Sequence, residues 1–193
     1  MSDKVKWSLA VARKLAEETR DYLRAFCTRI EIAGSVRRGK PEVGDIELVY
    51  VPRFSLEQDL AELLPRQMRI NQVDLALESL IAQGALSRRL NKLGREAWGA
   101  EIKLGRLLPS GIPIDFFSTM ESCFFNYLVC RTGSKESNMR VAQAAQAKGW
   151  KWNPFASGFS RAAGLGVERH AVTSEREVFE FVGLPCLEPK ERV

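Results

Sequence analysis

Carboxylates inside two apolar strand patterns constrain the fold of this chain more than any other feature. Asp45 and Glu47 alternate with aliphatic residues in the predicted strand 45–51, so both acids project from one face while the aliphatic side chains face a core. Asp115 lies within a second, strongly apolar strand pattern, 112–117. An unpaired carboxylate there is costly, so Asp115 needs either a basic partner or a metal ion. Two solvated acids are the alternative interpretation of the first pair taken alone.

The Gly34-Ser35 pair follows directly on a third strand pattern, 29–33. At the end of a strand, backbone N–H groups become free to meet an anion. The basic side chains that come next are Arg37, Arg38 and Lys40. A solvated loop is the alternative interpretation of this basic cluster. Because the cluster lies between the turn and the acids, we favour a nucleotidyl-transfer site, in which the turn holds a polyphosphate and the acids hold divalent ions.

Periodicity and capping signals place the remaining elements. An α/β unit with helices against a mixed sheet ends near residue 119, and a smaller subdomain follows. The segment 150–173 is rich in glycine and is expected to form a hairpin and loops. Helices are expected at 8–26, 72–83, 121–130, 134–148 and 174–182, and strands at 29–33, 45–51, 100–107 and 112–117.

Composition sets broad limits on the kind of protein. The hydrophobic fraction is 45%, the charged fraction is 27% and the formal net charge is +5, so a polyanionic partner is allowed but not demanded. The four cysteines have no CxxC spacing and are expected to be reduced, partly buried thiols. The absence of a signal peptide or long apolar segment predicts a cytoplasmic protein without a membrane partner. Nucleoid association and a viral or phage source are the alternatives.

Six segments, in order, resemble the DNA polymerase X family of the nucleotidyltransferase superfamily. They are spread over most of the chain after residue 30 and are Gly34–Glu47, Pro113–Phe116, Arg131–Arg140, Lys148–Asn153, Ser174–Phe179 and Glu188–Arg192. The resemblance implies a palm with a mixed β-sheet and helices at residues 1–119. It also implies a small α+β thumb at residues 120–193, within an overall α/β (α+β) fold class. The family's lyase activity is not expected.

The activity implied by the resemblance is metal-dependent addition of deoxynucleotides to a primer 3′-end with release of pyrophosphate, most plausibly filling short gaps in DNA repair. The implied partners are primer–template or gapped DNA and dNTP, with NTP as an alternative. Two Mg²⁺ ions, or Mn²⁺ in their place, would bind in each site of a monomer. Template-independent transfer to a strand end or small acceptor, and a catalytically weak DNA-binding subunit, are the alternatives.

The resemblance also implies roles for individual positions. Asp45, Glu47 and Asp115 would be catalytic and hold the metals. The nucleotide would contact Gly34, Ser35, Arg38, Gly44, Thr132, Gly133 and Asn138. The DNA would contact Arg140, Lys148 and Lys151. Further candidates for DNA phosphates, with ordinary surface charge as the alternative, are Arg161, Arg169, Lys190 and Arg192. One of Trp150 and Trp152 is expected in the core rather than stacked on bases.

Three positions depart from the family pattern. Glu47 stands where the polymerases usually have Asp, and its extra methylene moves the carboxylate by about 1 Å, so slow activity is expected. Cys130-Arg131 replaces an aromatic pair near the sugar, which motivates the hypothesis of relaxed selection between dNTP and NTP. Pro113 replaces a polar or basic residue two positions before Asp115 and so removes one possible partner of that acid.

Overall fold

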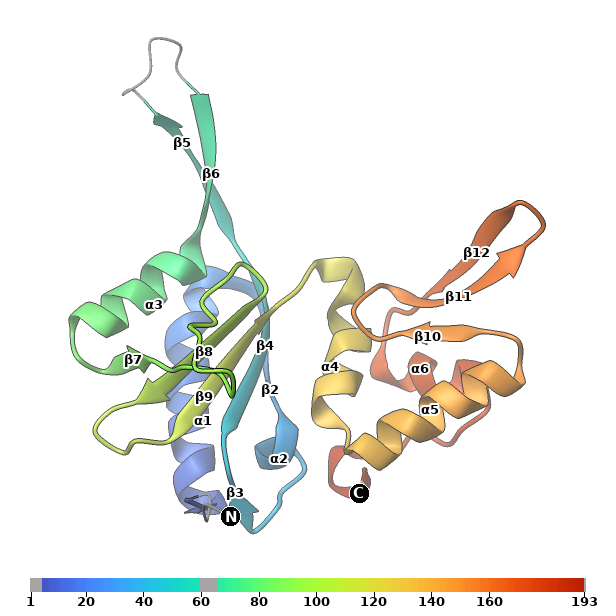
Figure 1. Ribbon diagram of the computed structural model, residues 1–193, viewed down its shortest axis with the longest axis horizontal. Coiled ribbons are helices and arrows are strands. Elements are labelled where there is room, and N and C mark those ends of the chain that lie inside the picture. Colours follow the sequence, from blue (N-terminus) through green and yellow to red (C-terminus); the bar gives the residue numbers. More distant parts are fainter. Residues whose placement is uncertain (1–4, 60–65, 193) are drawn as a thin grey trace.

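The computed structural model describes residues 5–59 and 66–192 of the chain. A five-stranded sheet forms the framework of the N-terminal part (Figure 1). The strand order is β2-β4-β9-β8-β7, and β4 pairs with β9 in parallel while the other neighbours are antiparallel. The strands are β2 (Cys27–Ala33), β4 (Ile46–Pro52), β7 (Leu86–Arg88), β8 (Ile102–Leu107) and β9 (Pro113–Ser118). The predicted α/β fold with a mixed sheet is confirmed.

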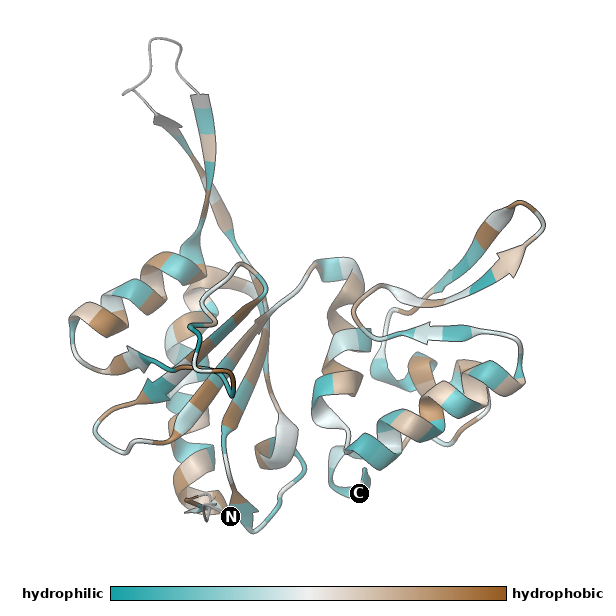
Figure 2. Cartoon of the chain, viewed as in Figure 1, coloured by the Kyte–Doolittle hydropathy of each residue, from teal (hydrophilic) through white to brown (hydrophobic). Residues whose placement is uncertain are grey.

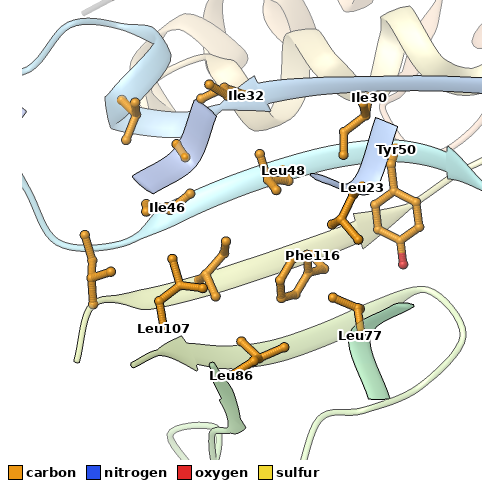
Figure 3. Packing of buried hydrophobic residues seen from close by; sticks show 14 of the residues in the cluster. Leu23, Ile30, Ile32, Ile46, Leu48, Tyr50, Leu77, Leu86, Leu107 and Phe116 are labelled. Carbon is orange, nitrogen blue, oxygen red and sulfur yellow. The ribbon is translucent and has the colours of Figure 1, made fainter. Parts of the chain in front are cut away.

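Helices α1 (Leu9–Leu23) and α3 (Gln72–Ala82) cover one face of the sheet. The side chain of Asn71 accepts hydrogen bonds from two free N–H groups at the start of α3, as an N-cap does. Alternate residues of β4 and β9 enter this core. Figure 3 shows Tyr50 and Phe116 near Leu23 and Leu77 of the two helices, with Leu48 and Ile46 further along β4 in the same core. Hydrophobic residues accordingly follow the central strands (Figure 2).

The opposite face of the sheet carries α4 (Phe124–Thr132), which follows the short 3₁₀ helix η2 (Glu121–Cys123). Phe117 of β9 and Val49 of β4 pack there against Phe124 and Tyr127. This helix also carries Val129 into the core of the C-terminal part of the chain. It therefore links the sheet to that part.

The C-terminal part packs helices against a small antiparallel sheet. Its elements are α5 (Lys135–Ala147), β10 (Lys151–Asn153), β11 (Gly158–Ala163), β12 (Gly166–Ala171), α6 (Glu175–Val182) and the 3₁₀ helix η3 (Pro189–Glu191). Ser134 caps α5 as predicted, since its Oγ accepts a hydrogen bond from the N–H of Ser137 at 3.0 Å. The predicted boundary at residue 119 remains a prediction. It falls between the end of β9 and the start of η2.

Two parts of the fold differ from the sequence-based prediction. An antiparallel pair of strands, β5 (Phe54–Asp59) and β6 (Arg66–Asn71), projects from the sheet (Figure 1), and the sequence patterns did not predict it. The predicted helix 8–26 ends earlier, because the chain tightens into the 3₁₀ turn η1 (Arg24–Phe26) before β2. A short ladder joins β1 (Trp7–Ser8) to β3 (Glu42–Val43).

Two expectations from composition can be compared with the structure. All four cysteines are free, and Cys27 and Cys123 are buried while Cys130 and Cys186 are partly buried, which confirms the predicted thiols. Within residues 5–59 and 66–192, no helix combines the length and apolar character that a membrane crossing requires.

Candidate nucleotidyl-transfer site

Two of the three predicted catalytic acids face each other across neighbouring strands. Glu47 of β4 and Asp115 of β9 are direct partners in the parallel ladder. Residues paired in this way project from the same face of a sheet, which here is the face opposite α1 and α3. Asp45 comes directly before β4. The predicted separation of acids from the aliphatic side chains is therefore observed, because Ile46 and Leu48 are fully buried on the other side.

Glu47 is partly buried, and its carboxyl group lies among other charged side chains. Burial raises its pKa to about 7, and the negative charges of Asp45 and Asp115 raise it too, while Arg131 and Arg38 act in the opposite direction. Gly34 makes this position possible. A Cβ on residue 34 would lie 1.9 Å from Oε2 of Glu47, and the φ of +61° also favours glycine there. Burial thus excludes the alternative of two solvated acids for Glu47.

This partly buried acid predicts a pH-dependent cost to stability. Because its folded-state pKa of about 7 lies above the ordinary 4.5, its stability contribution is complete below pH 4.5 and is lost as pH rises through 7. Relative to wild type, Glu47→Gln should gain about 2–3 kcal/mol in unfolding free energy between pH 5 and pH 8. Urea unfolding without divalent cations measures this. If the unfolding free energies of wild type and Glu47→Gln changed with pH in parallel, the raised pKa of Glu47 would be contradicted.

Asp115 has a basic partner that the sequence analysis did not identify. Nη2 of Arg89 lies 2.5 Å from Oδ1 of Asp115, and the two side chains are 24% and 14% exposed. Burial raises the pKa of Asp115, and the charge and hydrogen bond of Arg89 counter it without cancelling it. The predicted need for a partner is thus met by an arginine.

The acids alone do not form a complete metal-binding site. Among the residues that the structure describes, no three His, Cys, Asp or Glu side chains are gathered closely enough to hold an ion. Carboxylate oxygens are nevertheless the ligands that Mg²⁺ prefers, and Mg²⁺ commonly takes one or two of them plus substrate phosphates. The partly buried Glu47, destabilised by two neighbouring acids, fits a nearby cation.

The predicted phosphate turn has a different local structure. Gly34 and Ser35 open the one-turn helix α2 (Gly34–Arg37) rather than an open turn, because the N–H of Arg38 bonds the carbonyl of Gly34 at 3.1 Å. The Oγ of Ser35 is buried and has no hydrogen-bond partner within the described chain. Such an orphaned hydroxyl suits a missing polar ligand. Gly44 lies immediately before Asp45, and its contact with the nucleotide remains a prediction.

The arginines after Ser35 bind the C-terminal part of the chain. Arg37 donates to both carboxylate oxygens of Glu175, at 2.5 and 3.0 Å, and to Oγ1 of Thr132 at 2.8 Å. Arg38 donates to the backbone carbonyls of Thr132 and Gly133. The solvated-loop alternative is therefore wrong for these two arginines. Contact of Arg38 with a triphosphate remains a prediction.

The Thr132-Gly133 turn and the end of α4 are held by side chains from α5 and from the residue that follows α2. Thr132 is fully buried, and Nδ2 of Asn138 donates to the carbonyl of Cys130 at 2.8 Å. A Cβ on Gly133 would lie 2.5 Å from Oδ1 of Asn138, so only glycine fits between α4 and α5. The three predicted nucleotide contacts of this segment thus lie together, on the side where Arg38 reaches across from α2.

The guanidinium group of Arg131 packs against aromatic rings near the acids. Its guanidinium carbon lies 3.6 Å from the ring centroid of Phe117 and 4.9 Å from that of Tyr127, and Nη2 donates to the Tyr127 hydroxyl at 2.9 Å. The same cation lowers the pKa of Glu47. The departure at Cys130-Arg131 thus places a positive charge within electrostatic reach of the acids.

One predicted DNA contact is buried, whereas Lys148 is exposed and its contact with DNA remains a prediction. Nζ of Lys148 donates to the carbonyl of Phe181 at 3.0 Å, at the end of α6. Arg192 is 2% exposed, so its expected contact with DNA phosphates is wrong, because a buried guanidinium cannot reach a duplex. Arg140 on α5 and Lys151 on β10 have exposed side chains, so their contact with DNA remains a prediction.

Trp150 and Trp152 differ in burial. Trp152 is buried in the C-terminal core, and its indole N–H donates to Oδ1 of Asn126 at 2.7 Å. Trp150 packs on Phe181 with ring centroids 5.1 Å apart. The guanidinium carbon of Arg161 lies 4.5 Å from its ring centroid. The core role predicted for one of the pair is confirmed for Trp152.

Comparison with known proteins agrees with this arrangement. Residues 127–193 match the family model described as DNA polymerase beta thumb. DNA polymerase lambda of Arabidopsis thaliana is 26% identical over 190 residues, which are 93% of this chain and 34% of that protein. The chain therefore spans about a third of the length of the curated relative it matches. Residues 127–193 are thus similar to a DNA polymerase beta thumb, and most of the chain is similar to a DNA polymerase lambda.

Proposed function

We propose that this protein is a metal-dependent DNA polymerase of the X type, which adds deoxynucleotides to a primer 3′-end, releases pyrophosphate and fills short gaps during DNA repair. The observation that carries the proposal is the pairing of Glu47 with Asp115 on the face that also meets α2 and the Thr132-Gly133 turn. The acids, the candidate phosphate-binding residue and the candidate sugar-binding turn therefore lie on neighbouring elements, which supports the proposal.

In this proposal, each part of the site has one task. Asp45, Glu47 and Asp115 would hold two Mg²⁺ or Mn²⁺ ions, which would supply positive charge to stabilise the in-line displacement at phosphorus. Asp115 lies beside the primer 3′-hydroxyl and takes its proton, a role that suits a carboxyl whose pKa is raised by burial. The orphaned Oγ of Ser35 donates to a phosphate oxygen of the nucleotide.

The thumb side of the site holds the rest of the substrate. The Thr132-Gly133 turn meets the sugar, and Asn138 approaches the base from α5. Arg140 and Lys151 contact DNA phosphates, which position a duplex without reading its sequence. With Arg131 in place of an aromatic residue, the sugar pocket is proposed to accept NTP as well as dNTP.

Substrate choice tests this function. The purified chain, with Mg²⁺ or Mn²⁺, is given equal concentrations of a one-nucleotide-gapped duplex, a blunt duplex and a single strand. Preferential extension of the gapped primer by the templated nucleotide supports the proposal. Equal extension of all three would favour template-independent transfer instead. Direct competition between dNTP and NTP in the same assay tests sugar selection, and strong rejection of NTP would remove that part.

A catalytically weak DNA-binding subunit is the second candidate. It is favoured by the absence of a preformed three-acid group in the described chain and by the engagement of Asp115 with Arg89. A titration with Mn²⁺ and a nucleotide separates the two. Absence of metal binding together with tight binding of gapped DNA would support the subunit.

A further inference from the structure

Arg89 and Asp115 lie in one row across the sheet. The N–H of Arg89, just after β7, bonds the carbonyl of Leu104 at 2.8 Å. Leu104 is in turn the ladder partner of Asp115, and Asp115 is the partner of Glu47. Paired residues in such a row project from one face. The backbone register therefore directs the Arg89 side chain toward the acids.

The side chain of the neighbouring Arg88 points away from the acids. Its side chain lies on the other side of the strand, where Nη2 binds Glu78 at 2.7 Å and the guanidinium carbon lies 5.1 Å from the ring centroid of Trp98. Successive residues of a strand point to opposite faces. Of these two adjacent arginines, Arg89 alone contacts Asp115.

The contact holds Asp115 by one oxygen. Arg89 binds Oδ1 through Nη2, and a contact by a single nitrogen leaves Oδ2 for another ligand. The position two residues before Asp115, from which an alternate side chain of the same strand would point to the same face, is Pro113, which has no side-chain donor. The cation that orients this acid thus comes from another strand of the sheet.

We propose that Arg89 is the positioning residue of the active site, fixing the carboxylate of Asp115 so that its free oxygen faces the metal and the primer terminus. This inference rests on the proposed function but concerns a residue that the resemblance does not assign. Hydrogen-bonded partners of metal ligands typically contribute about 10–100-fold to metal affinity or activity, because they fix ligand orientation.

Two readouts test the role of Arg89. Arg89→Gln, which keeps a donor but removes the charge, should weaken Mn²⁺ binding about 10-fold or more in the presence of a non-hydrolysable deoxynucleotide triphosphate. Electron paramagnetic resonance of free Mn²⁺ measures this binding without turnover. In primer extension, kcat should fall by a similar factor while the KM for gapped DNA changes little. Arg89→Lys, which retains the charge, should recover part of both losses.

Arg88→Gln is the matched control and should behave as wild type in both readouts. Unchanged Mn²⁺ binding and kcat in a folded Arg89→Gln protein would overturn the inference, as would equal losses in the Arg88 variant. If wild type binds Mn²⁺ with nucleotide but does not extend primers, the proposed function fails. The Mn²⁺ titration of the Arg89 variants then still decides whether Arg89 positions Asp115.

Discussion

Asp115→Asn is expected to lower the rate of primer extension by about 100-fold or more, with Mg²⁺ or Mn²⁺ present. Asparagine has the shape of aspartate but carries no negative charge, and it cannot take the proton of a 3′-hydroxyl. The partner Arg89 remains beside residue 115 and would leave an uncompensated cation in the site. Single-turnover extension of a gapped duplex measures the rate of the chemical step directly.

The matched control for this variant is Asp74→Asn. Asp74 also pairs with a poorly exposed cation, since Oδ1 lies 2.8 Å from Nζ of Lys103, and Lys103 is 2% exposed. This pair belongs to α3 and β8 and lies away from the acid face. The control should therefore lose stability but keep extension within a few-fold of wild type. Equal activity of folded Asp115→Asn and wild type would refute the assignment of the acid.

Glu175→Ala is expected to destabilise the protein by about 3–5 kcal/mol. Glu175, at the start of α6, receives Arg37 from α2 and Nη1 of Arg192 at 2.7 Å. Its side chain is 17% exposed and that of Arg192 is 3% exposed. Burial raises its pKa, but the two arginines more than offset this and lower it overall. Truncation would leave two poorly solvated guanidinium groups without their shared anion.

Urea unfolding at pH 7 measures this loss. Because the folded-state pKa of Glu175 is lowered, its contribution is present above the ordinary pKa of glutamate and is lost as pH falls through the folded-state value. The control is Glu180→Ala on the same helix, whose exposed ion pair with Arg176 should contribute less than about 1 kcal/mol. A loss for Glu175→Ala no larger than for this control would contradict the bridging role.

Local patterns predicted the parts of the fold that depend on near neighbours. The alternation around Asp45 and Glu47 predicted which side chains enter the core, since a strand has a fixed period of two. The hydroxyl of Ser134 predicted the start of α5, since an N-cap is a contact over three residues. Motif order then predicted that Asp115 lies near the other acids.

Features that depend on strand register could not be predicted in the same way. Nothing local to Arg88 and Arg89 tells which of them faces Asp115, because that choice follows from their pairing with β8. The link from Arg37 to Glu175 joins residues 138 positions apart, so it exists only once the two parts of the chain have packed. The short helix α2 likewise depends on backbone bonds that glycine at position 34 permits.

In the function proposed here, this chain joins a nucleotide to a primer using the acids on and beside β4 and β9. The most direct measurement follows gapped DNA, one templated dNTP and Mg²⁺ with the purified chain, and quantifies lengthened primer and pyrophosphate together. We expect one pyrophosphate for each nucleotide added, and both products to form about 100-fold or more slowly with Asp115→Asn. A folded wild-type protein that yields neither product with Mg²⁺ or Mn²⁺ would contradict it.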